Sequence, residues 1–232
     1  MELHYYRGQR CNHSKEVVPV FALGHYIDKD DKKDEFSKTL MYFYKYGNDM
    51  NFFVDKFIEF FDVRIKGDMK IDFISLMPTN EKDILNPHML SFVNEVSKRI
   101  GIPYKQLLKR TKLVKEQHDL KTVDERMANV KDSIEVIYDV KGLNVIIFDN
   151  TSITGSTCSV AYDALKEAGV DKIYFFCFGL GKLGKKDDFD FNITNPIKAS
   201  EIVERFHWPK VSLIDRLFYK LKKQKNNIKN LL

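Results

Sequence analysis

The sequence predicts an α/β fold in which a mainly parallel sheet is flanked by helices. Residues 145–148 form a short unbroken apolar run, which is typical of a strand buried on both faces of a parallel sheet. Similar runs at 71–77 and 172–178 are separated from it by stretches in which apolar residues recur at helical spacing. The 232 residues, 44% of them hydrophobic, suffice for one well-cored α/β domain with additions.

The charge of the chain is unevenly distributed. The formal net charge is +5, but residues 205–232 contain eight Lys and Arg against one acid. A basic surplus at one end predicts a polyanionic partner. No apolar run is long enough to span a bilayer and the first ten residues lack an apolar signal core, so we expect no transmembrane segment and a cytoplasmic protein. Three cysteines without disulfide or zinc spacing fit a reducing compartment.

Residues 1–66 are predicted to form an N-terminal extension. Residues 17–21 and 22–26 have the composition of two short strands that pair with each other. Residues 34–61 show helical spacing of apolar residues, interrupted by the turn sequence GND at 47–49. The second half of this segment is rich in Phe, which we expect in the core; a homodimer interface is the alternative.

The strand predicted at 71–77 ends in a loop that belongs to a candidate site. In α/β sheets, ligands gather at the carboxyl ends of the strands. The loop that follows Pro78 offers three polar side chains for such a ligand, Thr79, Asn80 and Lys82. A helix is predicted from Pro87 to residue 100, because proline is tolerated in a first helical turn and Gly101 is a natural stop.

Residues 107–129 are polar and charged and contain neither Gly nor Pro. Two interpretations stay open for this segment, a mobile flap and a solvated charged helix. In a flap, Arg110 and Lys112 are placed to bring positive charge to an anionic leaving group when the flap closes.

Residues 144–169 predict a strand, a tight loop and a helix, and the chain is organised around them. The loop has small and hydroxyl side chains, and Gly155 lets the backbone approach a ligand closely. A helix N-terminus binds phosphate through its unpaired N–H groups and its dipole. Asp149 and Asn150 end the strand, where a carboxylate and an amide suit the hydroxyls of a ribose. We therefore expect a ribose 5-phosphate group, held by Ser152, Ile153, Thr154, Gly155, Ser156 and Thr157.

The remaining segments complete the predicted sheet and end in a tail. Residues 133–138 are predicted as a further strand of the same sheet, and residues 179–190 as a loop past a strand end. Residues 200–232 have the pattern of a basic amphipathic helix. Three interpretations of this tail stay open: contact with nucleic acid phosphates, docking on a partner or membrane surface, and a solvated helix.

The stretch VIIF-DN-TS-ITGST at 145–157 resembles the loop with which type I phosphoribosyltransferases bind phosphoribosyl pyrophosphate (PRPP). The family pattern has four apolar residues, two acids, a variable pair and then Thr-Thr-Gly-Ser-Thr. In this chain Asn150 replaces the second acid and Ile153 replaces the first Thr.

Upstream segments resemble one group of that family, the competence protein F (ComF)-like group. Its Arg-x-Arg/Lys, Gln, Leu, Arg and Asn occur at similar intervals here, as Arg110, Lys112, Gln117, Leu120, Arg126 and Asn129. The family's Lys-Tyr-Gly segment corresponds to residues 45–47. Its Pro-Val-Pro is replaced by residues 76–78, LMP, and its Arg-Gly-Phe-Asn-Gln segment has no counterpart. The resemblance covers residues 36–178.

The resemblance implies a type I phosphoribosyltransferase fold, with a core at 67–190 and a basic helical tail at 191–232. It implies transfer of a 5-phosphoribosyl group from PRPP to a nitrogen acceptor such as a nucleobase, with release of pyrophosphate. Mg²⁺ is the implied cofactor, with Asp149 as its ligand. The implied catalytic residues are Asp149, Asn150, Arg110 and Lys112, and the implied pyrophosphate loop contains Thr79, Asn80 and Lys82.

A second reading follows from the same resemblance. Because Asn150 replaces an acid and the pyrophosphate loop is short of basic residues, the chain is alternatively a catalytically weak or inactive module of the ComF type. Such a module would sense PRPP or a nucleotide and act in DNA uptake or DNA metabolism through its basic tail.

Overall fold

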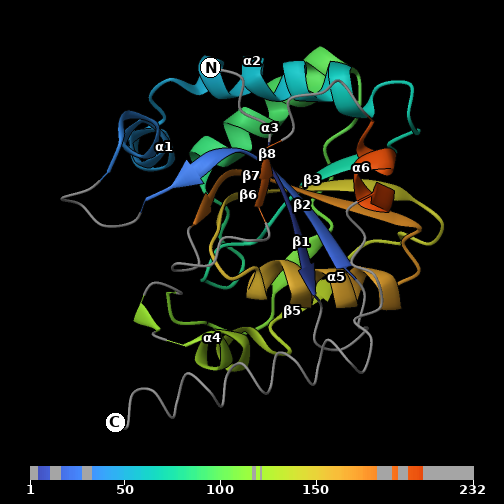
Figure 1. Ribbon diagram of the computed structural model, residues 1–232. Coiled ribbons are helices and arrows are strands. Elements are labelled where there is room, and N and C mark those ends of the chain that lie inside the picture. Colours follow the sequence, from blue (N-terminus) through green and yellow to red (C-terminus); the bar gives the residue numbers. More distant parts are fainter. Residues whose placement is uncertain are drawn as a thin grey trace, which may run out of the picture.

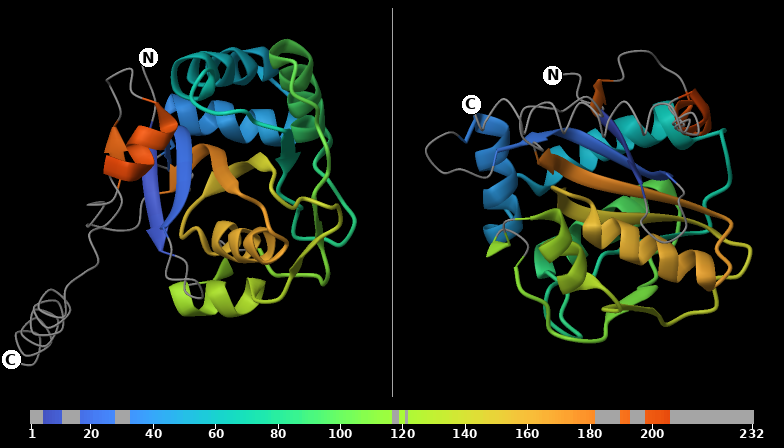
Figure 2. Two further views of the ribbon diagram at one scale, coloured as in Figure 1. Left: turned by 90° about the vertical axis from the view of Figure 1, so that its right-hand side faces the viewer. Right: turned by 60° about the horizontal axis from the view of Figure 1, so that its bottom comes forward.

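The computed structural model describes residues 5–10, 17–27, 33–116, 119–120, 122–181, 190–192 and 198–205. In this part of the chain, a six-stranded sheet has helices on both faces (Figures 1 and 2). Its strands are β1 (Tyr5–Arg10), β2 (Val17–Tyr26), β3 (Phe73–Leu76), β6 (Asn144–Ser152), β7 (Lys172–Gly181) and β8 (Asp190–Asn192). A separate two-stranded sheet contains β4 (Leu108–Arg110) and β5 (Ile134–Val136).

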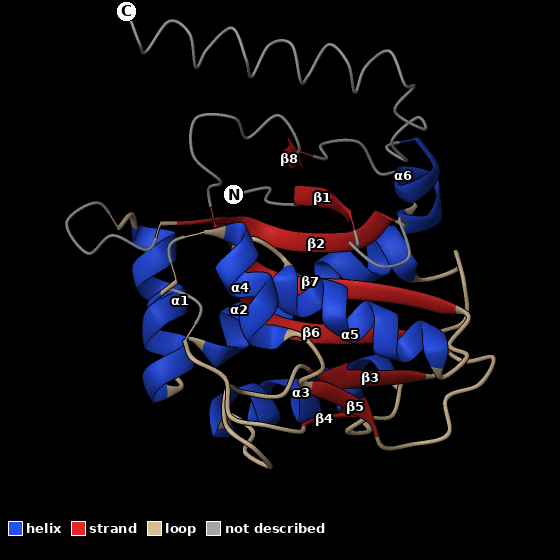
Figure 3. Ribbon diagram, turned by 90° about the horizontal axis from the view of Figure 1, so that it is seen from below, coloured by secondary structure: helices blue, strands red, loops and turns tan. Residues whose placement is uncertain are grey.

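The large sheet has the strand order β3-β6-β7-β2-β1-β8 (Figure 3). Its first four strands are parallel, and β1 and β8 add an antiparallel edge. The prediction of an α/β fold with a mainly parallel sheet is therefore confirmed. The parallel strands place their carboxyl ends at one edge, which is where ligands bind in folds of this class.

Helices cover both faces of the sheet. One face carries α1 (Glu35–Tyr46), α2 (Met50–Phe60) and α3 (Pro87–Ile100), together with the π-helix η2 (Phe61–Ile65) and α6 (Ala199–Arg205). The other face carries α5 (Ser156–Glu167), with α4 (Val123–Val130) beside it. The predicted break between α1 and α2 is confirmed, since Gly47 adopts φ 79° and ends α1. The predicted helix at 87–100 is confirmed as α3.

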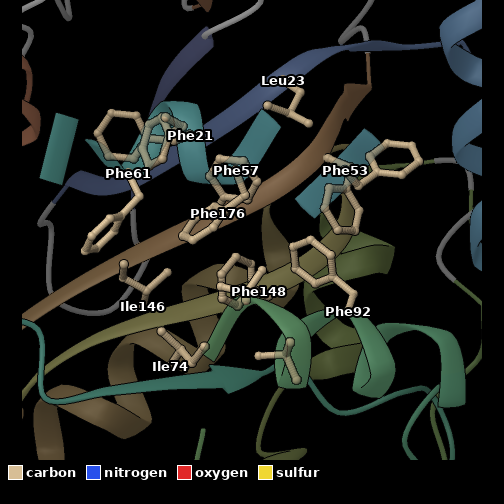
Figure 4. Packing of buried hydrophobic residues seen from close by; sticks show 14 of the residues in the cluster. Phe21, Leu23, Phe53, Phe57, Phe61, Ile74, Phe92, Ile146, Phe148 and Phe176 are labelled. Carbon is tan, nitrogen blue, oxygen red and sulfur yellow. The ribbon is translucent and has the colours of Figure 1, made fainter. Parts of the chain in front are cut away.

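The Phe-rich helix α2 belongs to the core, as its composition indicated. Phe57 lies in edge contact with Phe148 of β6 and Phe176 of β7, at ring-centroid distances of 4.7 and 4.8 Å (Figure 4). Such tilted and edge-on pairs stabilise a core beyond the burial of their area. Phe52 is 38% exposed, and the homodimer interface stays a prediction.

Two strand predictions were wrong. Residues 17–26 form one strand, β2, which pairs with β7 in parallel and with β1 antiparallel, so they do not pair with each other. The run 17–26 contains no turn sequence, so nothing folds it back on itself. The strand predicted at 133–138 is β5, which pairs with β4 outside the large sheet.

The segment 107–129 is not a continuous helix where the structure describes it, and the mobile-flap interpretation stays a prediction. It begins in β4 and ends in α4, which Thr122 and Glu125 start with a capping box. The loop predicted at 179–190 is wrong at both ends, because β7 continues through Gly181 and β8 begins at Asp190. Residues 182–189 and the basic tail beyond residue 205 lie outside the described residues.

The division at residues 66 and 190 stays a prediction. Strand β2, from the predicted extension, lies in the same sheet as β6 and β7. Helix α1, from the same extension, packs in one hydrophobic cluster with these strands. None of the helices in the described ranges is long and apolar enough to cross a membrane.

Candidate functional site

A cavity of about 310 Å³ opens at the carboxyl ends of β3 and β6. Its wall combines the loop after β3, the loop between β6 and α5, and side chains from β2, α1 and β4. Most of the residues predicted to form the site line this one cavity. They are Thr79, Asn80, Arg110, Asp149, Asn150, Ser152, Ile153, Thr154, Gly155, Ser156 and Thr157.

The loop between β6 and α5 is shorter than predicted, because β6 continues to Ser152. Asp149 pairs in register with Cys177 of β7, and Ser152 pairs with Leu180, so the backbone stays extended past the apolar run. Gly155 then adopts φ 64° and is the N-cap of α5, with no side chain capping the helix. The hydroxyls of Thr154 and Ser156 are hydrogen-bonded at 2.9 Å. The N-terminal amides of α5 thus face the cavity region with hydroxyl groups beside them, an arrangement suited to an anion.

Asp149 and Asn150 lie inside β6 rather than after it. The backbone N–H of Asn150 donates to Asp149 Oδ1 at 2.8 Å, and the N–H of Thr151 donates to Asn150 Oδ1 at 2.7 Å. Desolvation raises the pKa of Asp149 to about 7, against the lowering effects of the Asn150 N–H and the Arg110 charge. The site therefore holds a carboxylate in a poorly solvated place, where a positively charged ligand would stabilise its ionised form.

Arg110 lies in the wall of the cavity and is only 2% exposed. Its Nε donates to Thr79 O at 3.0 Å, its Nη1 to Ser133 Oγ at 2.7 Å, and its Nη2 to Pro78 O at 3.4 Å. Burial lowers the pKa of the guanidinium, and the Asp149 charge opposes that shift. Arg110 is thus a residue of strand β4 that holds the loop after β3 in place. The flap interpretation instead put Arg110 on a mobile segment.

Two predicted cations are not in the cavity wall. Lys82 and Lys112 are both exposed, and neither belongs to the lining of the cavity. Among the lining residues, which all lie in described parts of the chain, Arg110 is the single cationic side chain.

Tyr44 is a lining residue that the sequence reasoning missed. Burial raises the pKa of its hydroxyl, and the charge of Asp149 raises it further. Asn86 donates from Nδ2 to Tyr44 O at 3.1 Å and also caps α3, so α1 and α3 are tied together at the cavity. The signal was available, because Tyr44 directly precedes the Lys-Tyr-Gly segment and Asn86 directly precedes the helix predicted from Pro87. Other missed lining residues are Tyr26, Glu116 and Cys158.

Residues of the ComF-like pattern make backbone contacts in the described part of segment 107–129. Arg126 Nε donates to Leu120 O at 3.0 Å. Asn129 accepts from the Lys115 N–H and donates to Lys115 O, at 3.0 and 2.9 Å. These contacts hold Lys115 and Leu120 against α4. Gln117 lies outside the described residues.

Comparison with known proteins gave one match to a curated protein and several to solved structures. No family model matches the sequence. A stretch of 90 residues is 34% identical to a ribose-phosphate pyrophosphokinase of Shewanella oneidensis. The match covers 38% of this chain and 28% of that protein, so the chain spans little more than a quarter of this relative.

The solved structures with similar folds include phosphoribosyltransferases. An adenine phosphoribosyltransferase is 14% identical with a TM-score of 0.41, over 85% of this chain and 95% of that one. The purine phosphoribosyltransferase of Pyrococcus horikoshii is 18% identical with a TM-score of 0.34, over 64% and 77%. The UMP synthase of Leishmania donovani is 16% identical with a TM-score of 0.39, over 86% and 34%.

Proposed function

We propose that this chain binds PRPP and transfers its 5-phosphoribosyl group to a nitrogen acceptor, releasing pyrophosphate. The observation that carries the proposal is the placing of the uncapped N-terminus of α5 beside Asp149 in one cavity. An anion site and a carboxylate in the same cavity suit the phosphate and the hydroxyls of a ribose 5-phosphate. The 90-residue similarity to a ribose-phosphate pyrophosphokinase supports the same ligand class.

The 5′-phosphate would lie against the first turn of α5. Backbone N–H groups at a helix N-terminus attract a phosphate dianion, and Thr154, Ser156 and Thr157 can add hydroxyl donors. The Asp149 carboxylate would accept hydrogen bonds from the ribose hydroxyls, and the Asn150 amide would donate to them. As the bond from the anomeric carbon to pyrophosphate breaks, the Asp149 carboxylate would stabilise the positive charge on the ribose ring. The acceptor nitrogen forms the new bond and loses its proton.

The pyrophosphate would occupy the loop after β3. Thr79 and Asn80 line the cavity there, and the buried Arg110 holds the loop by its carbonyl groups while adding positive charge. We propose Arg110 as a positioning residue for this loop, and we expect Lys82 and Lys112 to reach the ligand only through a rearrangement of their segments.

The side chains of the cavity fit the cofactor Mg²⁺. This ion prefers oxygen ligands and usually keeps waters and substrate phosphates in its coordination shell. Carboxylates of Asp149 and Glu116 line the cavity, and Asp149 is the residue that we propose to hold the ion. When bound, Mg²⁺ would offset the negative charge of the pyrophosphate.

The experiment that tests the proposal is pyrophosphate release from Mg²⁺–PRPP. It is run without acceptor and then with adenine, guanine, hypoxanthine, orotate and uracil. Release that requires one of these bases would support the transferase and identify its acceptor. If no base promotes release and PRPP does not raise the unfolding temperature either, the proposal is wrong.

The cation-poor cavity favours a second candidate, a sensing module of the ComF type with weak or no turnover. Pyrophosphate departure needs positive charge, and Arg110 is already engaged by carbonyl groups and Ser133. In this case the chain binds PRPP or a nucleotide and acts in DNA uptake or metabolism through its basic tail. PRPP-dependent stabilisation without turnover, together with salt-dependent DNA binding lost on deletion of residues 211–232, would support it. Homodimer formation and a cytoplasmic location stay predictions from the sequence.

Gly155→Ala is expected to weaken PRPP binding by about tenfold, which is about 1.4 kcal/mol. The added methyl group would lie where the backbone approaches the phosphate, and φ 64° is unfavourable for a residue with a side chain. Isothermal titration with Mg²⁺–PRPP measures the change.

Gly142→Ala is the matched control for this variant. Gly142 has φ 73° in the turn before β6, and a Cβ there meets no atom within 4 Å. Both variants should lose about 1 kcal/mol of folding free energy through backbone strain. Equal PRPP affinities in the two variants would contradict the assignment of Gly155 to the phosphate site.

A further inference from the structure

Three metal-ligating side chains gather beneath the first turn of α5. The carboxylate of Asp149 and the thiol groups of Cys158 and Cys177 have their ligand atoms within 4.8 Å of one another. Neither cysteine forms a disulfide. The three residues come from three consecutive elements, β6, α5 and β7, so the cluster is a product of how these elements pack.

The sheet and α5 explain this convergence. Asp149 and Cys177 are register partners on the adjacent parallel strands β6 and β7, so their side chains point to the same face of the sheet. Cys158 belongs to the first turn of α5, which packs on that face, and it shares a hydrophobic cluster with Cys177. The two cysteines are 1% and 0% exposed.

The donor set is specific for a class of cation. Thiolates bind Zn²⁺ and other thiophilic ions, whereas Mg²⁺ selects oxygen ligands. With Zn–S bonds of about 2.3 Å and Zn–O bonds of about 2.0 Å, the donor atoms of a tetrahedral site lie roughly 3.5 Å apart. The present ligand atoms lie within 4.8 Å of one another, so shifts on the order of 1 Å would bring them to that spacing. The cavity, which Asp149 and Cys158 both line, supplies an entry path and water for a fourth ligand position.

We propose that Asp149, Cys158 and Cys177 form a binding site for one thiophilic divalent cation of the Zn²⁺ class. The ion binds the two sulfurs and the carboxylate, and the thiol protons are released to solvent. A cation held there occupies the carboxylate that would otherwise meet the ribose hydroxyls. We therefore expect the bound cation to exclude PRPP. This expectation rests on the proposed function, whereas the metal site itself does not.

The test is a titration of the reduced full chain with Cd²⁺ in oxygen-free buffer without PRPP. The ultraviolet charge-transfer absorption of Cd²⁺–thiolate bonds reports the binding. The expected result is saturation at one ion per chain. Loss of a residue that only hydrogen-bonds to a metal ligand typically weakens metal binding about 10- to 100-fold. We expect at least this loss in each of three variants that remove a ligand, Cys158→Ala, Cys177→Ala and Asp149→Asn. Cys11→Ala, which removes the third cysteine of the chain, should leave the titration unchanged.

X-ray absorption of the wild-type chain with one equivalent of Zn²⁺ keeps the test independent of how well the variants fold. Two sulfur neighbours at about 2.3 Å with oxygen in the remaining positions would support the site. A zinc shell of oxygen and nitrogen alone, or Cd²⁺ absorption that depends on Cys11 and persists in the Cys158→Ala/Cys177→Ala double variant, would overturn it.

Discussion

Asp149→Asn is expected to weaken Mg²⁺–PRPP binding by at least about 100-fold, a loss of about 2.7 kcal/mol. The substitution keeps the size of the side chain and an oxygen that can accept from the Asn150 N–H, as Asp149 Oδ1 does at 2.8 Å. It removes the charge that would hold Mg²⁺ and stabilise the ribose ring. Isothermal titration of the two proteins at one pH measures the loss.

The same variant is expected to be more stable than the wild type at neutral pH. Desolvation raises the pKa of Asp149 from 3.8 to about 7, so the folded state binds a proton that the unfolded state has released. The wild type therefore loses stability as the pH rises from 3.8 to about 7, and Asn has no such loss. Denaturant unfolding at several pH values should show the advantage of the variant growing through this window and then levelling off.

Asp171→Asn is the control for the affinity measurement. Asp171 is exposed and precedes β7, at the opposite edge of the sheet from the cavity. Its replacement should leave PRPP affinity unchanged. Unchanged affinity in Asp149→Asn, with a folded protein, would contradict the assignment of Asp149 to the ribose and the metal.

Arg110→Met is expected to lower the free energy of unfolding by about 3 kcal/mol, because buried acceptors would be left without their donor. The guanidinium donates to Thr79 O, Pro78 O and Ser133 Oγ, and Met offers no donor to replace it. The loop after β3 would lose its anchor, and the Asp149 carboxylate would lose its nearby positive charge. PRPP affinity should therefore fall together with stability.

Lys112→Met is the matched control, because it removes the other cation of the same Arg-x-Lys pattern. Lys112 is exposed and outside the cavity wall, so its replacement should change stability by less than about 0.5 kcal/mol. Denaturant unfolding of both variants measures the two changes in the free energy of unfolding. Similar small effects of the two substitutions would show that Arg110 does not hold the loop.

The elements around the candidate site were the best predicted parts of the chain. The apolar runs of β3, β6 and β7 and the proline and glycine limits of α3 are local signals, each complete within a few residues. The loop before α5 belongs to the same category, since Gly155 and the hydroxyl residues around it are adjacent in sequence. The candidate residues at 79, 80, 149, 150 and 152–157 were predictable for this reason, since the ends of neighbouring parallel strands meet at one edge.

Pairing between distant segments was not predictable from these signals. The composition of residues 17–26 indicates extended backbone but not the partner, and only the sheet shows that β2 lies between β7 and β1. Residues 134–136 have strand character as predicted, yet they pair with residues 108–110 in a separate sheet. A strand partner is chosen by packing over the whole core, and local propensity carries little of that information.

By itself, the sequence determined the type of the main helices and strands and the chemistry of the loop between β6 and α5, because both depend on residues within one or two turns of each other. The tertiary structure decided which distant side chains share an environment. It placed Arg110 against the carbonyl groups of the loop after β3, Tyr44 beside Asp149, and the thiols of Cys158 and Cys177 near the Asp149 carboxylate. Each of these contacts joins segments that are separated in sequence, and their burial changes the charge and hydrogen bonding that the side chains can offer.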